Sequence, residues 1–94
     1  MTNEMILLRQ MLDESGIEWH DASDDSEWYP IDRTHFENNG SWWSVIHGYG
    51  TYGGYSQYWN DEELLEVMNE NVNGGEPLGW QTAADIMKLV KGGS

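Results

Sequence analysis

The chain of 94 residues contains no cysteine, two prolines and only four basic residues. The absence of cysteine excludes disulfides, thiolate catalysis and metal sites held by thiolates. No apolar run approaches the roughly 20 residues of a membrane span. A signal peptide has a basic segment before its apolar stretch. No such segment precedes the short apolar patch at residues 5–8. We therefore expect one domain over residues 1–94 that is soluble, unexported and cytoplasmic, with residues 92–94 as either a flexible tail or a remnant of cloning.

The scarcity of basic residues leaves a strongly acidic chain. Seventeen Asp and Glu against four Lys and Arg give a formal net charge of −13. Binding to nucleic-acid phosphates or to an anionic membrane needs a basic surface, so we expect neither. Two interpretations of the acidity stay open. It keeps the protein soluble, or its carboxylates imitate phosphates and steer the protein toward a basic cleft in a partner.

The first helix is expected at residues 3–15. Apolar residues recur there at three- and four-residue spacing, and Gly16 stands where a C-terminal cap belongs. This pattern places Arg9 on the face toward water. Asp13 stands near the helix C-terminus, where the helix dipole disfavours an anion.

Two further helices are expected in the second half of the chain. Asn60 caps the first of them, acids fill its first turn, and the pair Gly74 and Gly75 stops it. Thr82 caps the last helix, which spans residues 83–91 and carries two lysines near its end.

The middle of the chain predicts a β-meander. Residues 17–20 alternate as a short edge strand does, and residues 28–36 are strand-like. Asn39-Gly40 favours a type I′ hairpin turn, which pairs Phe36 with Trp43. The Gly- and Tyr-rich segment that follows predicts a further, irregular strand. We expect an α+β fold with an N-terminal helix, a three- to four-stranded antiparallel β-meander and two C-terminal helices packed on one face.

Twelve aromatic residues, six of them tryptophan, are many for a chain of this length. A small domain uses large rings to fill its core. The adjacent Trp42 and Trp43 nevertheless point to opposite faces in any register. An exposed aromatic surface is typical of an interface, and a second copy of the chain is a candidate partner for it.

No motif in the sequence predicts catalysis. His20, His35 and His47 lack the spacing of metal ligands or of a base with its partner. The acidic segment 21–27 lacks the ligand spacing and the mid-loop glycine of a calcium loop. The glycine pattern at residues 48–53 has no helix after it. We expect no catalytic residue, no metal site, no cofactor and no enzymatic activity.

Two resemblances bear on function. The segment Leu8–Trp19, the acidic loop, the tryptophan-rich meander and the closing segment Thr82–Ile86 are similar to those of small proteins of unassigned activity from phages and prophages of gut bacteria. In architecture and charge the chain also resembles small acidic anti-CRISPR proteins, which combine a helix, a three-stranded meander and further helices and imitate DNA to block a nuclease. This second resemblance is a fold-level analogy.

The leading hypothesis is a non-enzymatic phage anti-defence protein that mimics nucleic acid. It would bind a host defence protein with a basic nucleic-acid-binding cleft, in the cytoplasm of the host bacterial cell. The partner-binding residues would be carboxylates with Trp42 or Trp43 as an apolar anchor. The carboxylates are those of Asp21, Asp24, Asp25, Glu27, Asp61, Glu62 and Glu63.

The alternative hypothesis is a small-molecule sponge that sequesters a nucleotide-derived immune signal in an aromatic pocket. Stacking of a base on tryptophan or tyrosine stabilises binding by about 1–3 kcal/mol per base, and an arginine is suited to a phosphate. The ligand-binding residues would be Arg33, Trp42, Trp43, Tyr49, Tyr52 and Tyr55.

Overall fold

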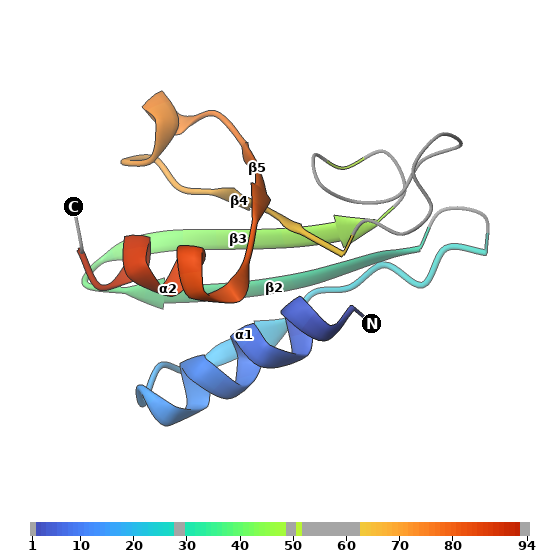
Figure 1. The fold of residues 1–94 in the computed structure, drawn as a ribbon, viewed down its shortest axis with the longest axis horizontal. Coiled ribbons are helices and arrows are strands. Elements are labelled where there is room, and N and C mark those ends of the chain that lie inside the picture. Colours follow the sequence, from blue (N-terminus) through green and yellow to red (C-terminus); the bar gives the residue numbers. More distant parts are fainter. Residues whose placement is uncertain (1, 28–29, 49–50, 52–62, 93–94) are drawn as a thin grey trace.

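The protein folds as a five-stranded antiparallel sheet with two helices on one face, as seen in a computed structural model that describes residues 2–27, 30–48, 51 and 63–92 (Figure 1). The strands lie in the sheet in chain order, β1-β2-β3-β4-β5. The elements are α1 (Asn3–Glu14), β1 (Trp19–Asp21), β2 (Ile31–Asn38), β3 (Ser41–Gly48), β4 (Leu65–Met68), a 3-10 turn (Asn73–Gly75), β5 (Leu78–Gln81) and α2 (Ala83–Val90).

The α+β class and the antiparallel meander are confirmed, but the strand count and the helix layout differ from the prediction. The sheet has five strands rather than three to four, and a single described helix, α2, follows it. The predicted helix that begins at Asn60 is wrong where it can be compared, because β4 occupies residues 65–68. Asn60 itself lies outside the described residues.

The strand at β4 has a physical reason. Leu65 and Val67 alternate along the chain, are both fully buried, and face the helices. β4 pairs with β3 through the register Val45↔Val67, so it satisfies backbone groups that an open β3 edge would leave unpaired. This long-range pairing outweighs the local acid-rich helix signal. β5, which the sequence pattern did not predict, then pairs with β4.

Helix α1 ends as expected. Gly16 has φ +71°, and its N–H donates to the Asp13 carbonyl at 3.1 Å. The Ile17 N–H donates to the Leu12 carbonyl at 2.9 Å. These two bonds form a Schellman motif, which satisfies carbonyls at the helix end. The Asp13 carboxylate, which the helix dipole disfavours at this end, is stabilised because it accepts a hydrogen bond from Trp19 Nε1 at 2.9 Å.

The central hairpin has the predicted register. Phe36 pairs with Trp43, and Asn39 and Gly40 both have positive φ, at 53° and 78°, as a type I′ turn requires. Because residues on a strand alternate between faces, the hairpin turns Phe36 and Trp43 toward the helices and their neighbours away from them.

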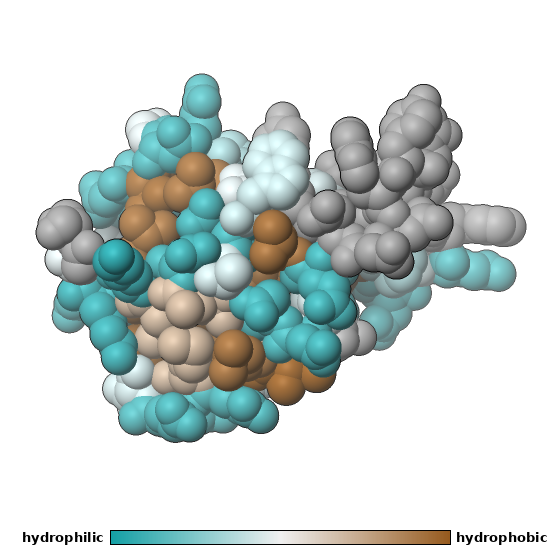
Figure 2. Space-filling model, viewed as in Figure 1, coloured by the Kyte–Doolittle hydropathy of each residue, from teal (hydrophilic) through white to brown (hydrophobic). Residues whose placement is uncertain are grey.

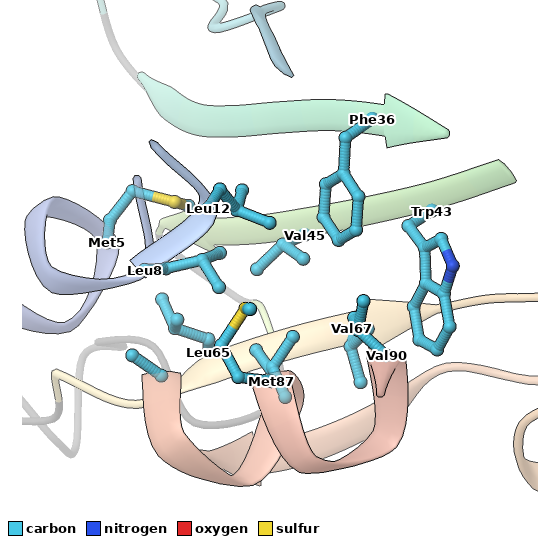
Figure 3. Close-up of a cluster of buried hydrophobic side chains, with 12 residues drawn as sticks. Met5, Leu8, Leu12, Phe36, Trp43, Val45, Leu65, Val67, Met87 and Val90 are labelled. Atoms are coloured by element: carbon cyan, nitrogen blue, oxygen red, sulfur yellow. The ribbon is translucent and has the colours of Figure 1, made fainter. Parts of the chain in front are cut away.

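The core lies between this face of the sheet and the two helices. Side chains from α1, β2, β3, β4 and α2 form one buried apolar cluster (Figure 3). On the outer surface in the view of Figure 1, hydrophilic side chains separate the apolar patches (Figure 2). No helix among the described residues has the length and apolarity needed to cross a bilayer.

The prediction that Arg9 faces water is wrong. Its side chain instead joins α1 to the sheet. Its Nε donates to Thr34 Oγ1 at 2.8 Å, one Nη donates to Asp21 Oδ1 at 3.2 Å, and the guanidinium lies 4.6 Å from the Trp19 ring centroid. Its side chain is only 11% exposed. Arg9 follows Met5 by four residues, which puts it on the buried stripe of α1, so the helical period offered a signal for this position.

The two helices meet near their N-termini. Thr82 and Asp85 form a capping box, in which the Asp85 N–H donates to Thr82 Oγ1 at 3.1 Å and the Thr82 N–H donates to Asp85 Oδ2 at 3.0 Å. The Ala83 N–H donates to Glu4 Oε1 at 2.8 Å. This contact holds the start of α2 against the first turn of α1.

Candidate functional site

Exposed carboxylates from two chain segments gather at one end of the sheet. Asp24, Asp25 and Glu27 are exposed on the loop between β1 and β2, and Glu63 is exposed just before β4. β2 and β4 run in the same direction in an antiparallel meander, so both segments enter the sheet at the same end. We call these four residues the acidic end.

The acidic loop is held by its own hydrogen bonds. Asp24 and Ile31 exchange two backbone hydrogen bonds, at 2.8 and 2.9 Å, and form an isolated β-bridge. Asp24 Oδ1 accepts from the Ser26 N–H at 3.0 Å, which closes a turn around the intervening Asp25. The backbone at residues 24–26 is therefore fixed, and it presents the Asp24 and Asp25 carboxylates.

Asp21, predicted as part of the same surface, has a structural role. Its Oδ1 accepts hydrogen bonds from the Ser23 hydroxyl and, at 3.1 Å, from the Ser23 N–H. Arg9 also donates to it. The Ser23 bonds, followed by the charge of Arg9, lower the pKa of the Asp21 carboxyl from its ordinary 3.8. Asp21 therefore stays ionised and ties β1 to α1.

The two lysines of the chain lie far from the acidic end. α2 starts beside the N-terminus of α1, which lies near Glu63 because Thr2 Oγ1 donates to the Glu63 carbonyl at 3.0 Å. α2 ends near the hairpin turn, where Asn38 Nδ2 donates to the Val90 carbonyl at 3.3 Å. Lys88 and Lys91 belong to this second end of α2. No lysine therefore lies beside the acidic end, and the basic group near its loop is Arg33, which donates to the Ala22 carbonyl.

The second feature is the sheet face that the helices leave uncovered, called here the open face. Trp42 lies on it with 51% of its surface exposed. Its ring meets the His35 ring edge to face, with centroids 5.2 Å apart. Trp42, His35, Met68 and the glycines of the 3-10 turn line a shallow groove of about 770 Å³. This groove offers ring surfaces and a single imidazole.

The structure separates the two adjacent tryptophans. Trp43 is 5% exposed and stacks on Phe36 at 5.9 Å between centroids, so Trp42 is the tryptophan that is available as an anchor. The acidic end and Trp42 lie at opposite ends of the β2–β3 hairpin, roughly 20 Å apart at the rise of an extended strand. They do not form one patch.

The residues of the sponge hypothesis are also divided. Arg33 shares the open face with Trp42, and one Nη of Arg33 donates to the Ala22 carbonyl at 3.4 Å. Trp43 is in the core. Trp42 lines the open-face groove, whereas Trp43 lines a smaller pocket at the hairpin-turn end. The remaining predicted site residues, Tyr49, Tyr52, Tyr55, Asp61 and Glu62, lie outside the described residues.

The histidines do not assemble a metal centre. His20 pairs with His35 across β1 and β2 on the open face, and His47 pairs with Asp32 as predicted. Burial, followed by the charges of Arg33 and His20, lowers the pKa of His35 from 6.5. Within residues 2–27, 30–48, 51 and 63–92, no three His, Asp or Glu side chains are close enough to hold a metal ion.

The arrangement as a whole presents a preorganised set of carboxylates at one end and an exposed aromatic surface on the open face. Both are suited to surface recognition, the first of cations and the second of apolar or aromatic groups. The chain matches no known protein family, no curated protein and no solved structure.

Proposed function

We propose that this protein is a non-enzymatic phage inhibitor of a bacterial defence protein, and that its acidic end occupies a basic cleft in place of nucleic-acid phosphates. The observation that carries the proposal is the acidic end itself. Carboxylates from two segments are exposed at the same end of the sheet, three of them on a loop that a β-bridge between Asp24 and Ile31 anchors, and both lysines lie at the other end.

Preorganisation is what makes these carboxylates suitable as phosphate mimics. A cleft that binds nucleic acid already places Lys and Arg to meet a row of anions. A flexible acidic tail would lose conformational entropy on entering it, whereas a hydrogen-bonded loop has lost most of that entropy on folding. The net charge of −13 adds long-range steering toward the cleft.

Trp42 supplies the apolar contact of the same interface. It lies on the hairpin that starts at the acidic loop, roughly 20 Å away along the strands. The molecule measures 37 × 24 × 18 Å, so a partner that contacts one long side reaches both features. A typical stable interface covers about 800 Å² on each partner, which such a side provides.

The sponge hypothesis has less support. Its aromatic residues lie on both faces of the sheet, with Trp42 exposed and Trp43 in the core. An anionic ligand would also have to approach a chain of net charge −13, which repels it. The acidic end therefore carries the proposal.

The test is capture of a partner from a gut-bacterial host lysate by the immobilised protein. We expect a nucleic-acid-binding protein that is released as salt rises from about 0.05 to 0.5 M, because screening weakens the contacts between charges, and that is displaced by competing DNA. A variant with Asp24→Asn, Asp25→Asn, Glu27→Gln and Glu63→Gln should lose capture.

The matched control changes four exposed acids away from the acidic end and from the groove around Trp42, Asp13→Asn, Glu14→Gln, Glu18→Gln and Glu76→Gln. Both variants lose four negative charges, so they have equal net charge. Retained capture by the control alone supports the proposed surface. Equal loss in both variants would assign binding to net charge, and a captured protein that competing DNA leaves in place would overturn the mimicry.

A further inference from the structure

A small pocket lies at the hairpin-turn end of the molecule, at the opposite end from the acidic end, and it borders the open-face groove at Asn69. The hairpin turn, the turn after β4 and the C-terminal end of α2 form its walls. Its volume is about 290 Å³, at the lower limit of ligand pockets and suited to a single ring. Trp43, Val72 and Leu89 contribute apolar lining, and Asn39 and Asn71 contribute polar lining.

One residue of the pocket lining, Trp43, carries a buried hydrogen-bond donor without an acceptor. Trp43 is 5% exposed, and its Nε1 has no hydrogen-bond partner among the described residues. Figure 3 shows this nitrogen on the ring edge that turns away from the labelled core side chains. A buried donor that stays unpaired destabilises the fold. A ligand that accepts a hydrogen bond from Nε1 would therefore gain binding free energy.

Three other polar side chains that line the pocket already donate hydrogen bonds within the protein. Asn38 Nδ2 donates to the Val90 carbonyl, and Asn69 Nδ2 donates to the Trp42 carbonyl at 2.8 Å. Asn71 Nδ2 donates to the Ser41 hydroxyl oxygen at 3.3 Å. Trp43 Nε1 differs from these groups in being buried without an acceptor, so a ligand that binds it must bring one.

The electrostatics of the pocket disfavour a charged ligand. No ionisable side chain lines it, so neither charge would find a counter-ion. The C-terminal end of α2 contributes to the wall, and carbonyl groups at a helix C-terminus disfavour anions. The apolar side chains require an apolar body beside the acceptor.

We infer that this pocket binds a small uncharged molecule whose carbonyl oxygen accepts from Trp43 Nε1 and whose apolar body packs against Val72 and Leu89. The nitrogen is buried although Trp43 lines the pocket, so the ligand reaches it when a lining side chain moves aside. This site is independent of the proposed acidic interface.

The experiment follows the indole N–H signals of the ¹⁵N-labelled protein by NMR, with Trp43→Phe to assign the Trp43 signal. The probes are 2-piperidone, valerate and piperidinium, which are similar in size but neutral, anionic and cationic. We expect 2-piperidone to produce a saturable downfield shift of the Trp43 indole proton. We expect no shift with either charged probe.

A second variant keeps the test decisive if Trp43→Phe does not fold. Val72→Phe fills the pocket from a half-buried lining position and should abolish the shift while leaving the indole in place. Trp42→Phe, on the opposite face, should leave the shift unchanged. An unmoved Trp43 signal with 2-piperidone, equal shifts with all three probes, or an undiminished shift in Val72→Phe would overturn the inference.

Discussion

Trp42 and Trp43 are adjacent in the chain, yet one belongs to the surface and the other to the core. Trp42 is 51% exposed and Trp43 is 5% exposed. On the covered face, Trp43 stacks on Phe36 and belongs to the buried apolar cluster. On the open face, Trp42 contacts the ring of His35. The difference shows that a strand gives neighbouring residues separate roles, one in packing and one in recognition.

The two faces of the hairpin also differ in chemistry. Thr34, Phe36 and Val45 on the covered face are fully buried. Arg33 and His35 on the open face are half-buried and ionisable. Substitutions on the covered face should therefore change the free energy of unfolding. Matched substitutions on the open face should leave it largely unchanged.

The tryptophan pair should show the largest contrast. Trp43→Ala removes a buried ring and leaves a cavity, so we expect a loss of about 3–5 kcal/mol in the free energy of unfolding. Trp42→Ala should change it by less than about 0.5 kcal/mol, as surface substitutions do. Urea denaturation followed by circular dichroism measures both. Similar losses for the two variants would contradict the assignment of faces.

The two arginines should give a smaller contrast. Arg9→Gln removes the donor to Thr34 Oγ1 and the partner of Asp21 beneath the sheet. A group left unpaired in such a place costs about 1–3 kcal/mol. Arg33→Gln loses a long bond to the Ala22 carbonyl and should cost less than about 1 kcal/mol. Melting temperatures of the variants compare the two, and a larger loss for Arg33→Gln would reverse the comparison.

A titration should separate the open face from the covered face. Burial lowers the pKa of His35 below 6.5 in the folded protein. The unfolded chain therefore binds this proton first, and stability should fall as pH drops from 6.5 toward the folded pKa. His35→Gln should flatten the melting temperature over this window. An unchanged slope in the variant would rule out His35 as its source.

The smallest effect is expected at the edge of the covered face. Asp21 has a pKa below 3.8 in the folded protein, chiefly through its bonds from Ser23. Its contribution to stability is complete above the unfolded pKa and is lost as pH falls below 3.8 through the folded value. Asp21→Asn should reduce the acid-induced loss of melting temperature in this lower window, while His35→Gln should leave that window unaffected.

Elements with local signals could be predicted from the sequence. The end of α1 at Gly16, the hairpin turn at Asn39-Gly40 and the capping box at Thr82 are each set by a few adjacent residues. β4 could not be predicted in this way. Its strand state depends on pairing with β3, which lies far along the chain, while its own residues and the acids before them favour a helix.

The candidate site was predictable in part. The residues of the acidic loop follow from composition, but Glu63 reaches the same end of the sheet only through the direction of β4. The pattern also showed that Trp42 and Trp43 face opposite ways. It did not show which one is buried, because that depends on the face that α1 and α2 cover.

The chain-order sheet has a consequence for how the protein folds. Each strand pairs with its neighbour in sequence, so the hairpin around Asn39-Gly40 closes a very short loop and loses little entropy in doing so. The contact between Glu4 and Ala83 spans nearly the whole chain and has the largest closure entropy to overcome. We expect the hairpin to form first during folding. The hydrogen bond between Glu4 and Ala83, which joins the two helices, should form last. The helical ends should then open first when native-state hydrogen exchange reports local unfolding.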